Sequence, residues 1–158
     1  MLNNIKENVS NYFLMIMNLK HSSDIGILIL RVFPGFAMFL NHGMSKISAG
    51  TAKWERLGSA LTDLIGFESL KIFFGFMASY AESLGALFIM VGLLTRFSSF
   101  LLFFTMIVAS LKHYFEGEFS ELAFIYCCIC FALMISGPGK YSVDNILKKK
   151  MIINLYLF

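Results

Sequence analysis

Four long apolar runs constrain this chain more than any other feature of its sequence. They cover residues 24–40, 71–94, 96–111 and 122–135. A helix that crosses a bilayer needs roughly 20 apolar residues, so we expect the short last run to extend by about a turn at each end. The apolar residues are contiguous and do not alternate with polar ones, which favours spanning helices over barrel strands. The expected fold class is all-α, an integral membrane four-helix bundle.

The composition agrees with a membrane location. Hydrophobic residues make up 58% of the chain and charged residues 15%, well below the roughly 25% typical of soluble domains. The length allows a single domain. The net charge is +3, and no basic array alternates with aromatic residues, so nucleic-acid binding is not expected.

Three segments organise the chain around these runs. Residues 1–22 lack the layout of a signal peptide, and their apolar residues recur at helical spacing. They predict either a short interfacial N-terminal helix or a frayed tail. Residues 23–147 form the predicted four-helix domain, in which residues 47–69 are a re-entrant or interfacial connection. Residues 148–158 form a basic and apolar C-terminal tail.

Two charged residues fall inside the predicted spans, Arg31 in the first and Glu82 in the second. At about 1.5 Å per residue, Arg31 lies roughly 10 to 16 Å and Glu82 roughly 20 Å from the cytoplasmic ends. An unpaired charge at that depth costs roughly 2.5 to 3.5 kcal/mol, so we expect the two to form an ion pair. The pair either binds an anionic or quinone-like head group and relays protons, or it is a structural clamp that fixes helix register.

A second polar layer is predicted toward the outer end of the bundle. The same count places His42, His113 and Tyr80 near about 25 Å, with Lys46 and Lys112 beside them. These residues form either the polar mouth of a cavity or an ordinary membrane interface, where such side chains collect. Two histidines with neither a Glu-x-x-His motif nor a neighbouring cysteine make a poor ligand set, so no metal site is expected.

The fourth run contains the only cysteines, Cys127, Cys128 and Cys130. Cys127 and Cys130 have the Cys-x-x-Cys spacing of thiol–disulfide exchange, and such a pair would pass electrons to a quinone. However, the chain has no second cysteine pair, and a cysteine in an apolar helix is usually a small buried hydrophobic residue. A thiol–disulfide oxidoreductase is therefore an alternative function and not the leading one.

The segment GPGKYSVD, residues 137–144, follows the fourth run. Its glycines and proline end the helix, and Asp144 is placed to cap a following helix over residues 145–150. We expect a structural turn in which Asp144 meets Arg96. A phosphate-binding loop is not expected, because the segment lacks the Gly-Lys-Ser/Thr ending and does not follow a strand.

The combined pattern resembles the DoxX family of small bacterial and archaeal membrane proteins. The resemblance covers roughly residues 24–148. The motifs that carry it are Arg31 with HGMSK at residues 42–46, Glu82 with GLLTR at residues 92–96, residues 109–113, and GPGKYSVD at residues 137–144.

The resemblance implies a four-helix membrane bundle in the bacterial cytoplasmic (inner) membrane. The family takes its name from a subunit of an archaeal quinone-linked oxidase system, so the leading hypothesis is a quinone-linked redox subunit or its accessory, in contact with a partner redox subunit. The expected binding residues for a quinone or another lipophilic ligand are Arg31, His42, Lys46, Tyr80, Glu82 and His113. The main alternative is a non-catalytic membrane subunit or small-ligand binder in which the Arg31–Glu82 pair is structural.

The distribution of positive charge predicts the orientation. Four spans place both termini on one side, where seven Lys and Arg residues fall, against five on the other side. Because cytoplasmic loops carry an excess of Lys and Arg, we expect cytoplasmic termini.

Overall fold

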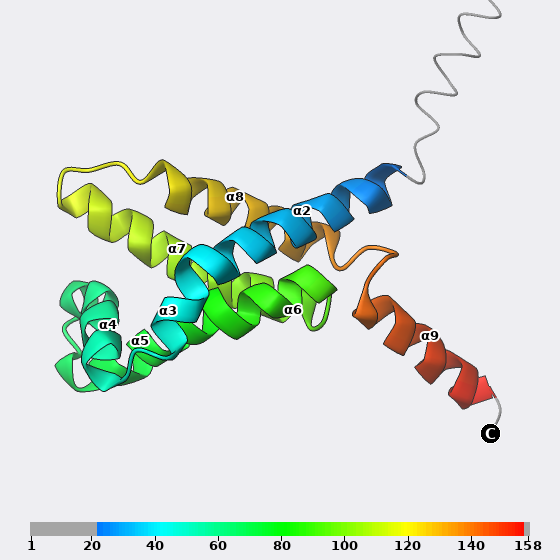
Figure 1. Ribbon diagram of the computed structural model, residues 1–158, viewed down its shortest axis with the longest axis horizontal. Coiled ribbons are helices and arrows are strands. Elements are labelled where there is room, and N and C mark those ends of the chain that lie inside the picture. Colours follow the sequence, from blue (N-terminus) through cyan, green and yellow to red (C-terminus); the bar gives the residue numbers. More distant parts are fainter. Residues whose placement is uncertain (1–21, 157–158) are drawn as a thin grey trace, which may run out of the picture.

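The structure is a computed structural model that describes residues 22–156, and in this range it contains helices and no strand (Figure 1). The predicted all-α class is confirmed. The predicted interfacial N-terminal segment lies outside the described residues, apart from Ser22, which begins the first helix.

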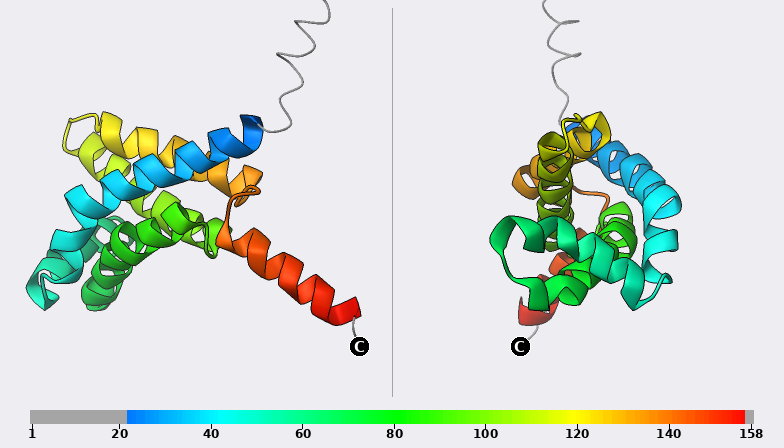
Figure 2. Two further views of the ribbon diagram at one scale, coloured as in Figure 1. Left: turned by 45° about the vertical axis from the view of Figure 1, so that its right-hand side comes forward. Right: turned by 90° about the vertical axis from the view of Figure 1, so that its left-hand side faces the viewer.

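Three helical rods are long and apolar enough to cross a membrane: residues Ser23–Ile47, Glu68–Val91 and Thr95–Phe115. The first joins α2 (Ser22–Met38), η1 (Phe39–Gly43) and α3 (Met44–Ile47). The second joins η2 (Glu68–Leu70), α5 (Lys71–Tyr80), η3 (Ala81–Gly85) and α6 (Ala86–Val91). The third is α7 (Thr95–Phe115), and the apolar helix α8 (Glu121–Ser136) is shorter. These helices pack side by side along a common direction (Figure 2).

The first two rods are each interrupted by one turn of π-helix, and the two π-turns, η1 and η3, pack against each other. Gly43 in η1 makes the close approach possible, because a side chain there would collide with the backbone of Glu82 and Ser83. A π-turn inserts an extra residue into a helix, and such turns occur frequently at functional sites. The two rods therefore touch backbone to backbone at the level of Glu82.

Helix α4 (Thr51–Ile65) folds back as a hairpin against α5. Gly58 faces the Lys71 carbonyl and Gly75 faces the Trp54 carbonyl, so the two helices meet without intervening side chains. Gly66, in the left-handed conformation, ends α4. Helix α4 is not among the rods long and apolar enough to span, which agrees with the prediction for residues 47–69.

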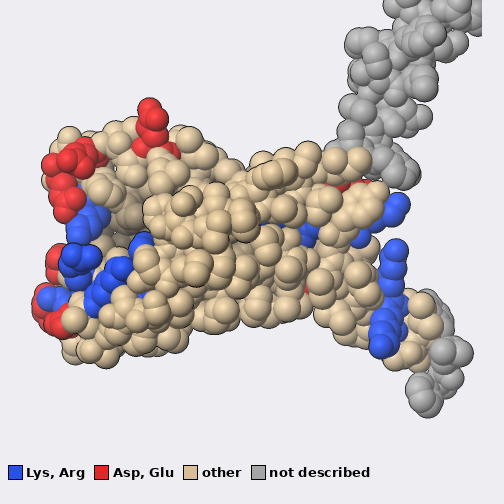
Figure 3. Space-filling model, viewed as in Figure 1, with Lys and Arg blue, Asp and Glu red and all other residues tan. Residues whose placement is uncertain are grey.

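The face of the bundle shown in Figure 3 is almost uncharged along its length, and charged residues gather at its two ends. Large apolar side chains such as Phe33, Phe73 and Phe97 are more than half exposed. Small polar residues, including Ser79, Ser83 and Ser99, are buried inside. This pattern is the reverse of that in a soluble bundle and suits a lipid environment.

The chain after α8 turns across the start of α7 and continues as α9 (Val143–Tyr156), which extends away from the bundle (Figure 1). The Asp144 carboxylate accepts hydrogen bonds from the backbone N–H groups of Leu94 and Thr95, at 2.8 and 2.9 Å, and from the Thr95 hydroxyl at 3.0 Å. Asp144 thus caps the N-terminus of α7.

Two predictions for Asp144 are therefore wrong, because its carboxylate binds the start of α7. Among the described residues it forms no ion pair with Arg96. The cap of α9 is Ser142, whose hydroxyl accepts from the Asn145 N–H at 3.2 Å.

Candidate functional site: a buried ion pair between two cavities

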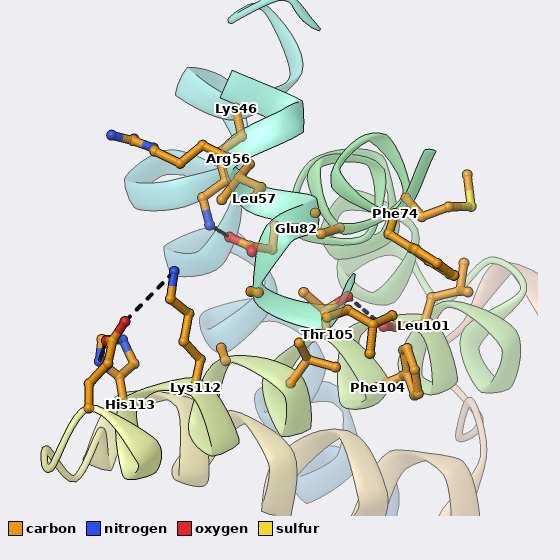
Figure 4. Close-up of a pocket in the computed structure, with 18 residues that line it drawn as sticks. Lys46, Arg56, Leu57, Phe74, Glu82, Leu101, Phe104, Thr105, Lys112 and His113 are labelled. Carbon is orange, nitrogen blue, oxygen red and sulfur yellow. Dashed lines mark hydrogen bonds and ion pairs between the residues drawn. The ribbon is translucent and has the colours of Figure 1, made fainter. Parts of the chain in front are cut away.

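The centre of the candidate site is an ion pair between Lys46 in α3 and Glu82 in η3 (Figure 4). The Glu82 side chain is 5% exposed and the Lys46 side chain 19%. The Trp54 indole N–H donates to the Lys46 carbonyl at 3.0 Å, which fastens the end of the first rod to α4. A carboxylate this buried requires a partner, and Lys46 supplies it.

The prediction that Arg31 pairs with Glu82 is wrong. Arg31 lies beside Gly92, about 15 Å further along the second rod than Glu82 at 1.5 Å per residue. Its Nη2 donates to the Tyr141 carbonyl at 2.6 Å. The first rod continues through the π-turn to Ile47 instead of ending near Leu40, so Lys46 is carried to the level of Glu82.

A cavity of about 470 Å³ opens beside the ion pair, between α4, α5 and α7 (Figure 4). Its wall is mainly apolar and consists of Leu57, Leu61, Phe74, Met77, Leu101, Phe104 and Val108 together with small residues. Its polar lining comprises Lys46, Glu82, Arg56, Thr105, Lys112, His113 and Glu116. We call it the larger cavity.

A second cavity, of about 180 Å³, lies on the other side of the ion pair, and we call it the smaller cavity. It is lined by Met38, His42, Lys46, Glu82, Met106, Ala109, His113, Ser120, Leu122 and Ala123. Lys46, Glu82, Ala109 and His113 line both cavities. The ion pair therefore stands in the wall that the two cavities share.

The structure brings together four of the six predicted site residues. Lys46, Glu82 and His113 line both cavities, and His42 lines the smaller one. Tyr80 lines neither, and its ring instead lies 6.5 Å from that of Phe76. Arg31 lines neither cavity and is buried at the opposite end of the rod.

Sequence reasoning missed the contribution of α4 to the larger cavity. Leu57 and Leu61 lie one turn apart and share one helix face with Gly58, while Arg56 reaches the polar end. The signal was present in the apolar spacing of residues 57, 58 and 61, which marks one side of a helix.

The cysteines are not part of the lining of either cavity. Cys127 and Cys130 are buried in the core with free thiols, and Cys128 is exposed. Among residues 22–156, no group of three or more His, Cys, Asp or Glu side chains is arranged to hold a metal ion.

A helical bundle with an apolar outer surface, charged ends and a buried ion pair defines a small integral membrane protein. The DoxX family model matches residues 26–114, which run from α2 almost to the end of α7 and include both π-turns and the ion pair. The chain belongs to the DoxX family.

The chain is also similar to a curated protein, the inner membrane protein YqjF of Escherichia coli (strain K12). The two are 32% identical over 144 residues, which cover 84% of this chain and 99% of the relative. No solved structure matches.

Proposed function

We propose that the protein binds a lipophilic small molecule with a polar head group, of the quinone class, in the larger cavity. The observation that carries the proposal is the position of the Lys46–Glu82 pair at the polar end of a mainly apolar cavity. Its volume of about 470 Å³ lies within the range of roughly 300 to 1,000 Å³ that is typical of ligand pockets.

The chemistry of the lining suits a quinone. Quinone carbonyl oxygens accept hydrogen bonds, and the Lys46 ammonium and the His113 imidazole supply donors on two sides of the polar end. The apolar tail would lie against Phe74, Leu101 and Phe104, which come from α5 and α7. In this role the protein is a quinone-linked redox subunit or its accessory, and a partner redox subunit supplies or removes the electrons.

Filling the larger cavity tests the proposal. Leu61→Trp places an indole in the cavity wall, whereas Leu64→Trp changes the same helix at a residue that is 43% exposed and does not line the cavity. We expect purified wild type and Leu64→Trp to bind a short-chain quinone, measured by equilibrium dialysis in detergent, and Leu61→Trp to lose at least tenfold in affinity. Equal affinity of all three proteins, or absence of binding to the wild type, would contradict the proposal.

A second candidate function is a non-catalytic membrane subunit in which the ion pair only fixes helix register. The contact of the two π-turns at Gly43 favours it, because the pair lies where the rods must align. The double variant Lys46→Met, Glu82→Gln removes both charges while keeping the side-chain sizes similar. If each single substitution destabilises the bundle while the double variant folds and binds quinone with the affinity of the wild type, the pair is a clamp and contributes nothing to binding.

We further propose that the protein resides in the inner membrane with four crossings, including α8, and with both termini in the cytoplasm. The support is the name of the relative, an inner membrane protein, and the sequence count of seven Lys and Arg residues on the side of the termini against five on the other. Fusing a phosphatase that is active only outside the cytoplasm after Phe158, or into the loop at Gly117, tests this orientation. We expect activity from the loop fusion alone.

A further inference from the structure

The smaller cavity has a higher share of polar lining residues than the larger one. Five of its ten lining residues are polar: His42, Lys46, Glu82, His113 and Ser120. A cavity of about 180 Å³ with several polar walls has room and partners for several water molecules, whereas apolar cavities stay dry. A lipophilic ligand therefore fits the larger cavity better, and water fits the smaller one.

The smaller cavity also connects the ion pair with the end of the bundle where α7 meets α8. His113 lines it, has a side chain that is 43% exposed, and lies in the last turn of α7. Its Nδ1 lies 3.8 Å from a carboxylate oxygen of Glu116 and 3.6 Å from one of Glu118. An imidazole between aqueous carboxylates and a cavity is suited to exchange protons with the solvent.

We propose that the smaller cavity is a water-filled route by which protons from the aqueous phase reach Glu82. The proposal deepens the proposed function, because it assigns a proton supply to the same ion pair that faces the larger cavity. One proton moves from hydronium to a Glu82 carboxylate oxygen, which leaves a neutral carboxylic acid and a water molecule. The Lys46 ammonium keeps its charge, loses its anionic partner and becomes available to a ligand head group.

Other charged groups face the pair and affect this step. The first rod contributes His42, α7 contributes Lys112 and His113, and Glu116 follows directly after α7. Helix α4 contributes Arg56 to the larger cavity. The start of α8 contributes only uncharged residues to the smaller cavity, namely Ser120, Leu122 and Ala123. These charged and polar side chains surround the pair, and the smaller cavity gives Glu82 a polar path to the end of the bundle.

Cysteine accessibility tests whether the cavity holds water. In a chain whose three native cysteines are replaced by alanine, Met106→Cys places a thiol in the wall of the smaller cavity. Leu102→Cys is the matched control, because it lies one turn away on the same helix, is similarly buried and lines neither cavity. We expect silver ion, which is small and charged, to react with Met106→Cys at least tenfold faster than with Leu102→Cys in membrane vesicles. Equal rates would overturn the proposal.

Blocking the route provides a second measurement. Ala123→Phe fills the smaller cavity, while Ala132→Phe adds the same ring to an exposed position of α8. We expect the first substitution, but not the second, to slow silver labelling of Met106→Cys at least tenfold. Labelling that is unaffected by Ala123→Phe would overturn the proposal.

Infrared difference spectroscopy detects the proton itself. On acidification, the wild type should gain a carboxylic acid band that is absent in Glu82→Gln, and its absence in the wild type would overturn the proposal. Quinone binding is measured on the same preparations, so the two proposals fail separately. If silver labels Met106→Cys and the carboxylic acid band appears, but quinone does not bind, only the proposed function is contradicted. If quinone binds, but the labelling and the band are both absent, only the proton route is contradicted.

Discussion

The first rod carries a buried cation near each end, and the two have different environments. Arg31 is 1% exposed and binds a backbone carbonyl of the turn before α9. Its Nε and Nη1 have no hydrogen-bond partner among the described residues, yet neither cavity reaches it. Lys46 is less buried, but it pairs with a carboxylate and has a cavity on each side. A buried charge thus indicates a binding site only where there is space beside it.

The backbone explains why space exists at one end only. Near Lys46 the two rods contain facing π-turns, and α4, α5 and α7 supply most of the wall of the larger cavity there. Near Arg31 the helices are regular, and Gly92 lets the guanidinium fill the space beside it. The Arg31 end should therefore respond to substitution in stability alone, and the Lys46 end in both stability and binding.

The largest effect is expected for Lys46→Met, which leaves the Glu82 carboxylate buried without its partner. Removing one member of a buried ion pair typically costs about 3 to 5 kcal/mol, and the partial exposure of Lys46 favours the lower end. We expect a loss of about 3 kcal/mol in the free energy of unfolding, measured by denaturant titration in detergent, together with weaker quinone binding.

Restoring neutrality is the control for that experiment. Adding Glu82→Gln to Lys46→Met should recover most of the stability without recovering quinone affinity. A single variant as stable as the wild type would show that Glu82 has enough water around it to remain charged alone.

A smaller effect, confined to stability, is expected for Gly92→Ala. Gly92 has a φ of +77°, and a Cβ there would meet the Arg31 guanidinium and lie 2.6 Å from the Cβ of Ser142. The left-handed conformation alone costs an alanine roughly 1 to 2 kcal/mol, and the Arg31 and Ser142 side chains must shift as well, so we expect a total loss of about 2 kcal/mol.

Gly26→Ala is the matched control for this substitution. Gly26 is helical, and a Cβ there would meet nothing within 4 Å, so its replacement should be neutral or slightly stabilising. Quinone affinity should be unchanged in both variants, and a tenfold loss in Gly92→Ala would contradict the separation of the two ends.

The sequence predicts the helical rods better than it predicts which charges meet. Hydrophobic runs and the loop at residues 47–69 define the rods, because a spanning helix must be continuously apolar. The prediction that Arg31 pairs with Glu82 counts residues from the membrane surface and assumes that the first rod ends before Lys46. The π-turn η1, within this rod, packs against η3 through Gly43. Such a contact between two rods cannot be predicted from a local sequence pattern.

The same distinction holds for the candidate site. His42, Lys46, Glu82 and His113 could be found as polar residues near one end of apolar helices, and the structure places all four at the cavities. The apolar spacing of residues 57, 58 and 61 indicates the α4 wall of the larger cavity, but the position of that wall depends on the glycine contacts between α4 and α5. Cavities are produced by the way helices separate, and hydrophobic periodicity does not encode that distance.

A modest loss of stability is expected for Asp144→Ala, which removes the cap of α7. Three donors would lose their acceptor, and a helix cap is worth about 0.5 to 2 kcal/mol. We expect a loss of about 1 to 2 kcal/mol with unchanged quinone affinity. Asp63→Ala is the control, because the Asp63 side chain is exposed and accepts no hydrogen bond in the described part of the chain. It should change the free energy of unfolding by less than about 0.5 kcal/mol.

The smallest effect is expected for Tyr80→Phe, which tests the boundary of the candidate site. Tyr80 was predicted to belong to the polar mouth, but it lines neither cavity, and its hydroxyl has no hydrogen-bond partner among the described residues. Its ring packs near Phe76, and phenylalanine keeps that contact. Because only a hydroxyl without a partner is removed, the free energy of unfolding and the quinone affinity should both stay within error of the wild type. His113→Phe, at a residue that lines both cavities, is the positive control and should weaken quinone binding. If Tyr80→Phe weakened it equally, the ligand would have to reach beyond the larger cavity to the face of α5 that carries Tyr80.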